Sequence, residues 1–157
     1  MPAIETLSRL VDDATAAYIL ENQKCFEDLK QVASQLAGLL VLAAAGSKSA
    51  LPEHPMLEAA QQLFREAADA LRRARPTPRA QPHHRHLKQA AGAIGRALNA
   101  AVRCFRPLGG GLDIDPILLP LRAGYEELER AARALPGFET VAYDRACCGQ
   151  AGASSRT

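Results

Sequence analysis

Three histidines stand close together where a proline-rich connector meets a predicted helix, in the stretch "RPTPRAQPHHRHLK". They are His83, His84 and His86. The N-terminal end of a helix carries partial positive charge and disfavours further cations, so we expect these imidazoles to be neutral and solvated. An anion or an acidic partner bound at the helix start is a second interpretation, because free backbone N–H groups attract negative charge. A metal ion is a third.

A metal held by these histidines would need ligands from another part of the chain. His84 and His86 are two residues apart, whereas neighbours on one helix face are three or four apart, so the two cannot face one ion together. The vicinal pair Cys147 and Cys148 is the candidate, because an antiparallel bundle brings the C-terminal tail to the same end as the connector. The candidate metal site therefore comprises His83, His84, His86, Cys147 and Cys148. Two of these histidines together with the two cysteines would suit tetrahedral zinc. An ordinary tail, a thiol switch and an intermolecular disulfide are the other interpretations of the cysteine pair.

The stretch "HLKQAAGAIGRAL" resembles the phosphorylated helix of histidine phosphotransfer domains, which are also four-helix bundles. In that family the histidine lies three residues before a lysine. The lysine here is Lys88, and Arg85 stands three residues before it. A one-residue shift turns a side chain by about 100° around a helix, so neither His84 nor His86 takes the histidine's place. Phosphotransfer is therefore only a minor alternative.

The middle of the chain is basic. Residues 70–112 hold nine lysines and arginines and no acidic residue, although the net charge of the whole chain is only +2. Arg85, Lys88, Arg96 and Arg103 share the polar face of one predicted helix and form a candidate site for an anion or a partner. A solvated face, pairing with the acidic first helix and an acidic protein partner are the main interpretations. Nucleic acid is less favoured, because no aromatic residue lies between the cations.

Other motifs exclude several classes of enzyme. The glycine-rich "GGGLDID" lacks the Gly-Lys-Ser/Thr ending of a P-loop, and no Glu-x-x-His pair supports a di-iron carboxylate bundle. No serine or cysteine lies in a recognisable nucleophile setting. Cys25 and Cys104 fall among apolar helix positions and are predicted to be core residues. The chemistry in this sequence thus leans towards binding without catalysis.

Four helices must position these residues. Apolar residues recur every three or four positions over residues 3–45, 55–75, 82–106 and 116–135, and prolines or glycines separate these segments. No alternating pattern predicts a strand. We therefore expect one all-α domain over residues 1–157, an up-down-up-down four-helix bundle. Its core should be rich in alanine, because aromatic residues make up only 4% of the chain.

The first predicted helix is much longer than the others, and its start should project beyond them. Leu7, Val11, Ala14 and Tyr18 would then form a bare apolar stripe, which a soluble monomer rarely exposes. We expect the C-terminal tail, residues 137–157, to dock on this stripe through Phe138, Val141 and Tyr143. A homodimer that covers the stripe, or a break in the helix near residues 21–23, are the alternatives.

No run of 18 apolar residues predicts a membrane span, and the N-terminus lacks the pattern of a secretory signal. A cytoplasmic location is expected. The function predicted from the sequence is that of a non-enzymatic helical bundle that mediates protein–protein interaction or self-association. The alternative is a bundle that binds a metal or an anion, with a redox or sensory role at a thiol and histidine site.

Overall fold

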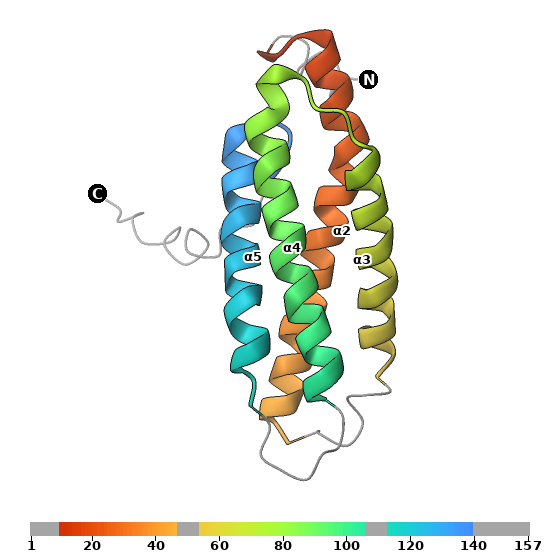
Figure 1. Ribbon diagram of the computed structural model, residues 1–157, viewed down its shortest axis with the longest axis vertical. Helices are drawn as coiled ribbons and strands as arrows, with labels where there is room; N and C mark the ends of the chain where they lie inside the picture. The colour runs from red at the N-terminus through yellow and green to blue at the C-terminus, as the bar shows by residue number, and fades with distance from the viewer. Residues whose placement is uncertain (1–9, 47–53, 106–112, 140–157) are drawn as a thin grey trace, which may run out of the picture.

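The computed structural model describes residues 10–46, 54–105 and 113–139. In these ranges the chain forms four long helices and no strand, which confirms the all-α prediction. The helices are α2 (Asp13–Ala44), α3 (Pro55–Arg73), α4 (Gln81–Cys104) and α5 (Asp115–Ala134), and a short 3₁₀ turn, η2 (Pro78–Ala80), precedes α4. Successive helices run in opposite directions, so the bundle has the expected up-down-up-down order (Figure 1). None of these described helices is long and apolar enough to cross a membrane.

The first long helix begins later than the sequence pattern predicts. Leu10 is helical, Val11 and Asp12 are not, and α2 starts at Asp13. Asp12 has an extended backbone, and its carboxylate accepts hydrogen bonds from the backbone N–H and the hydroxyl of Thr15 at 2.9 and 2.8 Å. This N-cap satisfies free donors at the start of α2 and interrupts the helical backbone there, although the apolar spacing continues across it to the buried Val11. The prediction of one helix from residue 3 is therefore wrong, and the break lies at Asp12, not near residues 21–23.

The connector after α3 covers the start of α2. The hydroxyls of Thr15 and Thr77 lie 2.7 Å apart, which joins α2 to the residue that caps η2. Val11 and Tyr18 are buried, so this part of the predicted stripe is covered, whereas Ala14 is exposed. Leu7 lies outside the described residues.

The beginning of the tail also packs on α2, as predicted. The ring of Phe138 lies edge-on to Phe26, with 5.3 Å between the ring centroids. Two hydrogen bonds add to this contact: Gln23 donates to the carbonyl of Gly137, and Lys30 donates to the carbonyl of Glu139. The predicted contacts of Val141 and Tyr143 fall outside the described residues.

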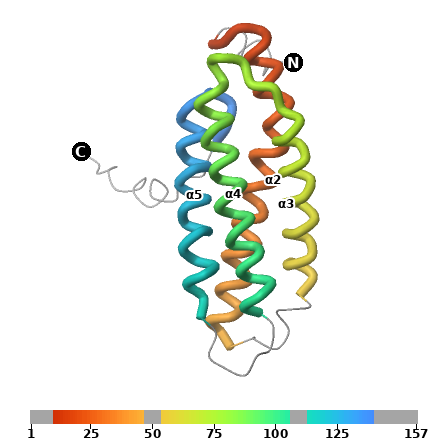
Figure 2. The backbone as a smooth tube through the Cα atoms, viewed as in Figure 1, coloured from red at the N-terminus to blue at the C-terminus, as the bar shows by residue number. Residues whose placement is uncertain are grey.

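The helices form two closely packed pairs, α2 with α3 and α4 with α5 (Figure 2). Two glycines allow close approach at α4. A Cβ atom on Gly95 would lie 2.7 Å from the ring of Phe64 on α3, and one on Gly124 of α5 would lie 2.7 Å from the Ile94 side chain. With its many alanines, α4 lies close to both α3 and α5.

Candidate functional site: the histidine end and basic face of α4

His83 is fully buried, which corrects the prediction that all three histidines are solvated. Its ring stacks on that of Phe138 with a centroid distance of 4.0 Å, and its Nδ1 lies 3.1 Å from the hydroxyl of Tyr18. Burial lowers the pKa of His83 to about 4, from an ordinary value of 6.5. The imidazole is therefore neutral at neutral pH, as predicted. The cause is its burial away from water and not the partial positive charge of the helix start.

Tyr18 joins two histidines through one hydroxyl group. Its oxygen lies 3.1 Å from Nδ1 of His83 and 3.2 Å from Nδ1 of His84, and burial raises the pKa of Tyr18, so the phenol keeps its proton. One hydroxyl donates one hydrogen bond and accepts others, so it must donate to one ring and accept from the other.

The surroundings of His83 decide which group donates in each of these two hydrogen bonds. Its Nε2 has no hydrogen-bond partner among the described residues. A buried N–H group without an acceptor is rarer than a buried acceptor without a donor, so the proton belongs on Nδ1. His83 then donates to Tyr18, Tyr18 donates to His84, and His84 carries its proton on Nε2. No pattern in the sequence predicts that Tyr18 belongs to this cluster.

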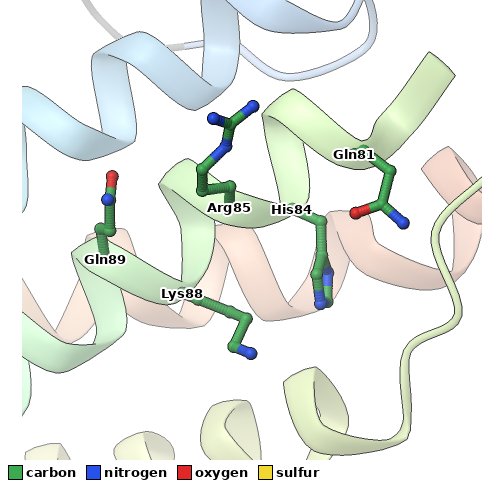
Figure 3. Close-up of a pocket in the computed structure, with 5 residues that line it drawn as sticks. All are labelled: Gln81, His84, Arg85, Lys88 and Gln89. Carbon is green, nitrogen blue, oxygen red and sulfur yellow. The ribbon is translucent and has the colours of Figure 1, made fainter. Parts of the chain in front are cut away.

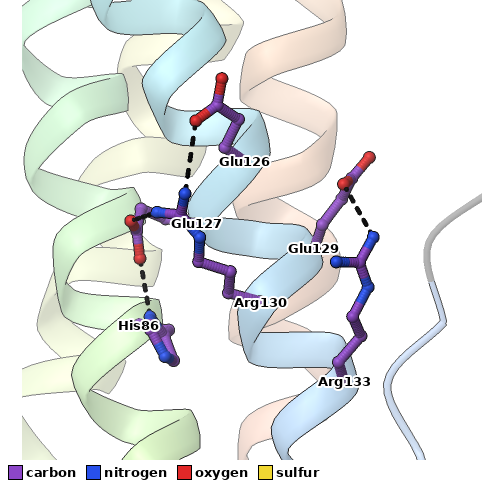
Figure 4. Close-up of polar contacts among 6 residues, drawn as sticks. All are labelled: His86, Glu126, Glu127, Glu129, Arg130 and Arg133. Atoms are coloured by element: carbon purple, nitrogen blue, oxygen red, sulfur yellow. Dashed lines mark hydrogen bonds and ion pairs between the residues drawn. The ribbon is translucent and has the colours of Figure 1, made fainter.

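His86 belongs to a separate network between α4 and α5 (Figure 4). Its Nδ1 lies 2.7 Å from a carboxylate oxygen of Glu127, which also pairs with Arg130. Arg130 reaches Glu126 at 3.6 Å as well, and a neighbouring pair joins Arg133 to Glu129 at 3.3 Å. Hydrogen bonds from His86 and Arg130 lower the pKa of Glu127 despite its partial burial. His86 therefore positions α5 against α4.

The structure does not bring the candidate zinc ligands together in the part of the chain that it describes. His83 and His84 meet at Tyr18, His86 faces Glu127, and no group of three histidine, cysteine or acidic side chains in this part is arranged to hold a metal. Cys147 and Cys148 lie outside the described residues. The remaining hypothesis for a zinc site rests on the sequence alone.

Cys25 is a core residue, as predicted. Its side chain is 1% exposed and its Sγ lies 3.4 Å from the carbonyl oxygen of Ala67 on α3. Burial raises the pKa of this thiol to about 12. A protonated, enclosed thiol is a poor nucleophile and a poor metal ligand, so Cys25 contributes to packing.

The four predicted binding cations lie exposed on α4. Arg85, Lys88, Arg96 and Arg103 have no carboxylate within 4.0 Å in the described ranges. The expected pairing with the acidic first helix is not seen there, because the ion pairs of α2 are formed largely with its own lysines, Lys24 and Lys30. The basic face of α4, defined here by these four side chains, is a row of cations without internal partners in the described part of the chain.

Two hollows lie beside the histidine end of α4. One, of about 440 Å³, is lined by residues of α4 alone: Gln81, His84, Arg85, Lys88 and Gln89 (Figure 3). The second, of about 430 Å³, is a groove between the end of α3 and the start of α4 that shares two of these residues, His84 and Lys88. The α3 wall brings two arginines, Arg72 and Arg75, to these residues. Separate helices build this groove, so no local spacing in the sequence indicates it.

Comparison with known proteins leaves the family open. No protein-family model matches the chain, and no solved structure does. The sequence is similar to a serine–tRNA ligase from Desulforamulus reducens, with 34% identity over 55 residues. The matched segment is 34% of this chain, and it spans only 13% of the ligase. A similarity confined to so small a part of both proteins shows no family membership.

Proposed function

We propose that this protein is a helical interaction module whose basic face on α4 docks an acidic protein partner. One observation carries the proposal: four exposed cations lie along α4 with no carboxylate within 4.0 Å among the described residues. Exposed charges on a functional face orient a partner and speed its association. The cytoplasmic location expected from the sequence is part of this proposal.

The geometry of the basic face suits an elongated acidic segment. Arg85 and Arg103 are 18 positions apart, which corresponds to about 27 Å along the helix axis. Gly92 and Asn99 are exposed between the cations, and Gly92 has no Cβ, so a partner's backbone can approach closely. A partner helix with acidic residues three or four positions apart would match the row.

A protein partner fits this face better than nucleic acid. Single-stranded nucleic acids are bound through aromatic side chains on which bases stack, and α4 carries no aromatic residue between Gln81 and Cys104 apart from its histidines at the first turns. The net charge of +2 also gives little long-range attraction for a polyanion. A second copy of this chain is a less favoured partner, because Glu126, Glu127 and Glu129 on α5 already have basic partners.

The test measures binding of a labelled helical peptide with glutamates three and four residues apart. Arg96→Gln/Arg103→Gln should weaken binding about tenfold, because two rim charge pairs contribute about 1.4 kcal/mol together. The matched control is Arg65→Gln/Arg122→Gln, which removes the same charge from exposed arginines on α3 and α5. This control should change binding less than about twofold.

Three outcomes would contradict the proposal. Equal loss in both double variants would mean that only net charge matters. Tighter binding of duplex DNA than of the peptide, with a steep salt dependence, would assign the face to nucleic acid. A concentration-dependent mass in sedimentation that Arg96→Gln/Arg103→Gln abolishes would make the partner a second copy.

A further inference from the structure

The groove between α3 and α4 combines an apolar floor with a basic rim. The floor is made by the small or aliphatic side chains Ala68, Leu71, Ala74 and Ala91, and the rim by Arg72, Arg75, His84 and Lys88. Ligand sites commonly pair apolar walls with a few placed polar groups. The groove, with a volume of about 430 Å³, has this composition and no acidic residue in its lining.

Most of the positive charge on the rim is not neutralised by the described residues. Arg72 pairs with Asp69, the acidic residue one turn before it on α3. Arg75 directs its Nη1 to the carbonyl oxygens of Arg72, Arg73 and Ala74 at 3.2–3.3 Å, which fixes the guanidinium at the end of α3 while its charge remains. Lys88 has no carboxylate within 4.0 Å in these ranges.

The imidazole of His84, a rim residue, is oriented by a hydrogen bond with the buried Tyr18. Its Nδ1 lies 3.2 Å from the hydroxyl of Tyr18, which is 3% exposed. With the tautomer of His83 inferred above from its unpartnered Nε2, Tyr18 donates to this Nδ1, so Nε2 of His84 carries the proton as a donor. In Figure 3, the side chains of His84 and Lys88 extend to the same side of α4, towards the end of α3. The buried tyrosine thus holds a neutral donor beside the ammonium group of Lys88 and the two arginines.

We propose that this groove binds an organic phosphate, with the phosphate group on Lys88, His84 and Arg75 and the organic part on the apolar floor. Two negative charges match a rim of several cations better than the single charge of a carboxylate, and arginine binds phosphate oxygens through its planar fork. The proposal goes beyond an acidic protein partner, because it uses α3 and a small ligand. Arg96 and Arg103 have no part in it.

The test follows the imidazole signals of the full-length protein by NMR during titration with phenyl phosphate. The charged groups that face His84 are Arg72, Arg75 and Lys88, with Asp69 behind Arg72 and the Tyr18 hydroxyl on α2. In the free protein, burial and the charge of Lys88 lower the pKa of His84. A bound dianion stabilises the imidazolium, so the pKa of His84 should rise by about one unit, whereas His54 serves as an internal reference.

Other ligands separate the possible sources of the signal. Phenyl phosphate should bind about tenfold more tightly than inorganic phosphate, because its ring covers the apolar floor. Tighter binding of benzoate would assign the groove to carboxylates and contradict the proposal. An unchanged pKa of His84 at millimolar phenyl phosphate would overturn it.

Variants distinguish this site from the basic face. Lys88→Gln and Arg75→Gln should each weaken phenyl phosphate binding about tenfold, and circular dichroism would check that α3 keeps its end without the Arg75 contacts. Arg96→Gln/Arg103→Gln should leave phenyl phosphate binding unchanged. Unchanged phenyl phosphate binding by Lys88→Gln and Arg75→Gln would refute the proposed phosphate site in the groove. A variant that loses only acidic-peptide binding would bear on the proposed function and not on this site.

Discussion

The two faces of α4 show how differently one helix can use its residues. The inner face buries His83, Leu87 and Ile94, and even its imidazole meets a phenol and a phenylalanine ring. The outer face carries cations that meet no carboxylate among the described residues. The chain therefore covers the inner face with its own side chains and leaves only Nε2 of His83 there without a hydrogen-bond partner among the described residues. The outer face, in contrast, carries positive charge that the described residues do not pair.

The largest expected difference between the faces is in stability. Ile94→Ala should lower the free energy of unfolding by about 3 kcal/mol, because Ile94 is fully buried against α5 and its loss leaves a cavity. Arg96→Ala, two residues along on the outer face, should change it by less than about 0.5 kcal/mol. Urea unfolding measures both. Similar losses in the two variants would mean that the outer face is structural.

The second difference is a pH dependence that belongs to the inner face. His83 has a pKa of about 4 in the folded protein and about 6.5 when unfolded. Between these two pH values the unfolded chain binds about one more proton than the folded protein does. The free energy of unfolding therefore falls as the pH falls from 6.5 to 4. The slope is about 1.4 kcal/mol per pH unit, which amounts to about 3 kcal/mol over the whole interval.

The matched control for this pH effect is His83→Phe, which keeps a ring against Phe138 and cannot titrate. Its unfolding free energy, measured from pH 7 to pH 4, should lack this one-proton slope and keep only the change due to other groups. An identical slope in the wild type and in His83→Phe would show that His83 is not the group responsible.

The two glycines of α4 give a smaller, opposite pair of effects. Gly95→Leu should destabilise the bundle by about 2 kcal/mol, because a Cβ there already meets the ring of Phe64 at 2.7 Å. Gly92→Leu should stabilise it by about 0.5 kcal/mol, since the position is exposed and leucine favours a helix more than glycine does. Thermal unfolding of the two variants compares them directly, and stabilisation by both would mean that Phe64 moves freely.

Sequence patterns predicted the inner face of α4 well. The apolar spacing over residues 82–106 predicts one buried helix face, and the residues on that face are buried: Leu87, Ala91, Ile94, Leu98 and Ala101. A helix with a single apolar face can turn only that face towards the core. The same reasoning placed the four basic residues on the outside. It also predicted that Phe138 returns to α2, since an exposed apolar stripe needs a cover.

The prediction that His83 is solvated is wrong, because it rests on the polarity of histidine and not on the position of His83 along the helix. His83 lies four residues before Leu87, so the register of the apolar row includes it, and that signal could have predicted its burial. Asn22 is a parallel case on α2: it lies four residues after Tyr18, is buried, and donates to the carbonyl of Tyr18 at 2.8 Å. Polar residues on an apolar row are buried when a partner lies within reach.

Other features depend on contacts between distant segments. The break at Asp12 had a local signal, an aspartate before another acidic residue, but the apolar spacing continued across it. The pair of Thr15 with Thr77 joins residues 62 positions apart. The groove is formed by the end of α3 and the start of α4, which the proline-rich connector brings together. Helical periodicity predicts the buried face and the ends of each helix. It carries no information about which helix ends lie next to each other in the fold.

Charge reversal on the outer face separates a role of Arg96 and Arg103 in binding a partner from a role in holding the bundle together. Arg96→Glu/Arg103→Glu should leave the free energy of unfolding within about 0.5 kcal/mol of the wild type and switch the preferred peptide from a glutamate-rich to a lysine-rich helix. Unchanged binding of the acidic peptide would show that these arginines do not contact a partner. A loss of stability above about 2 kcal/mol would show that they hold the bundle together.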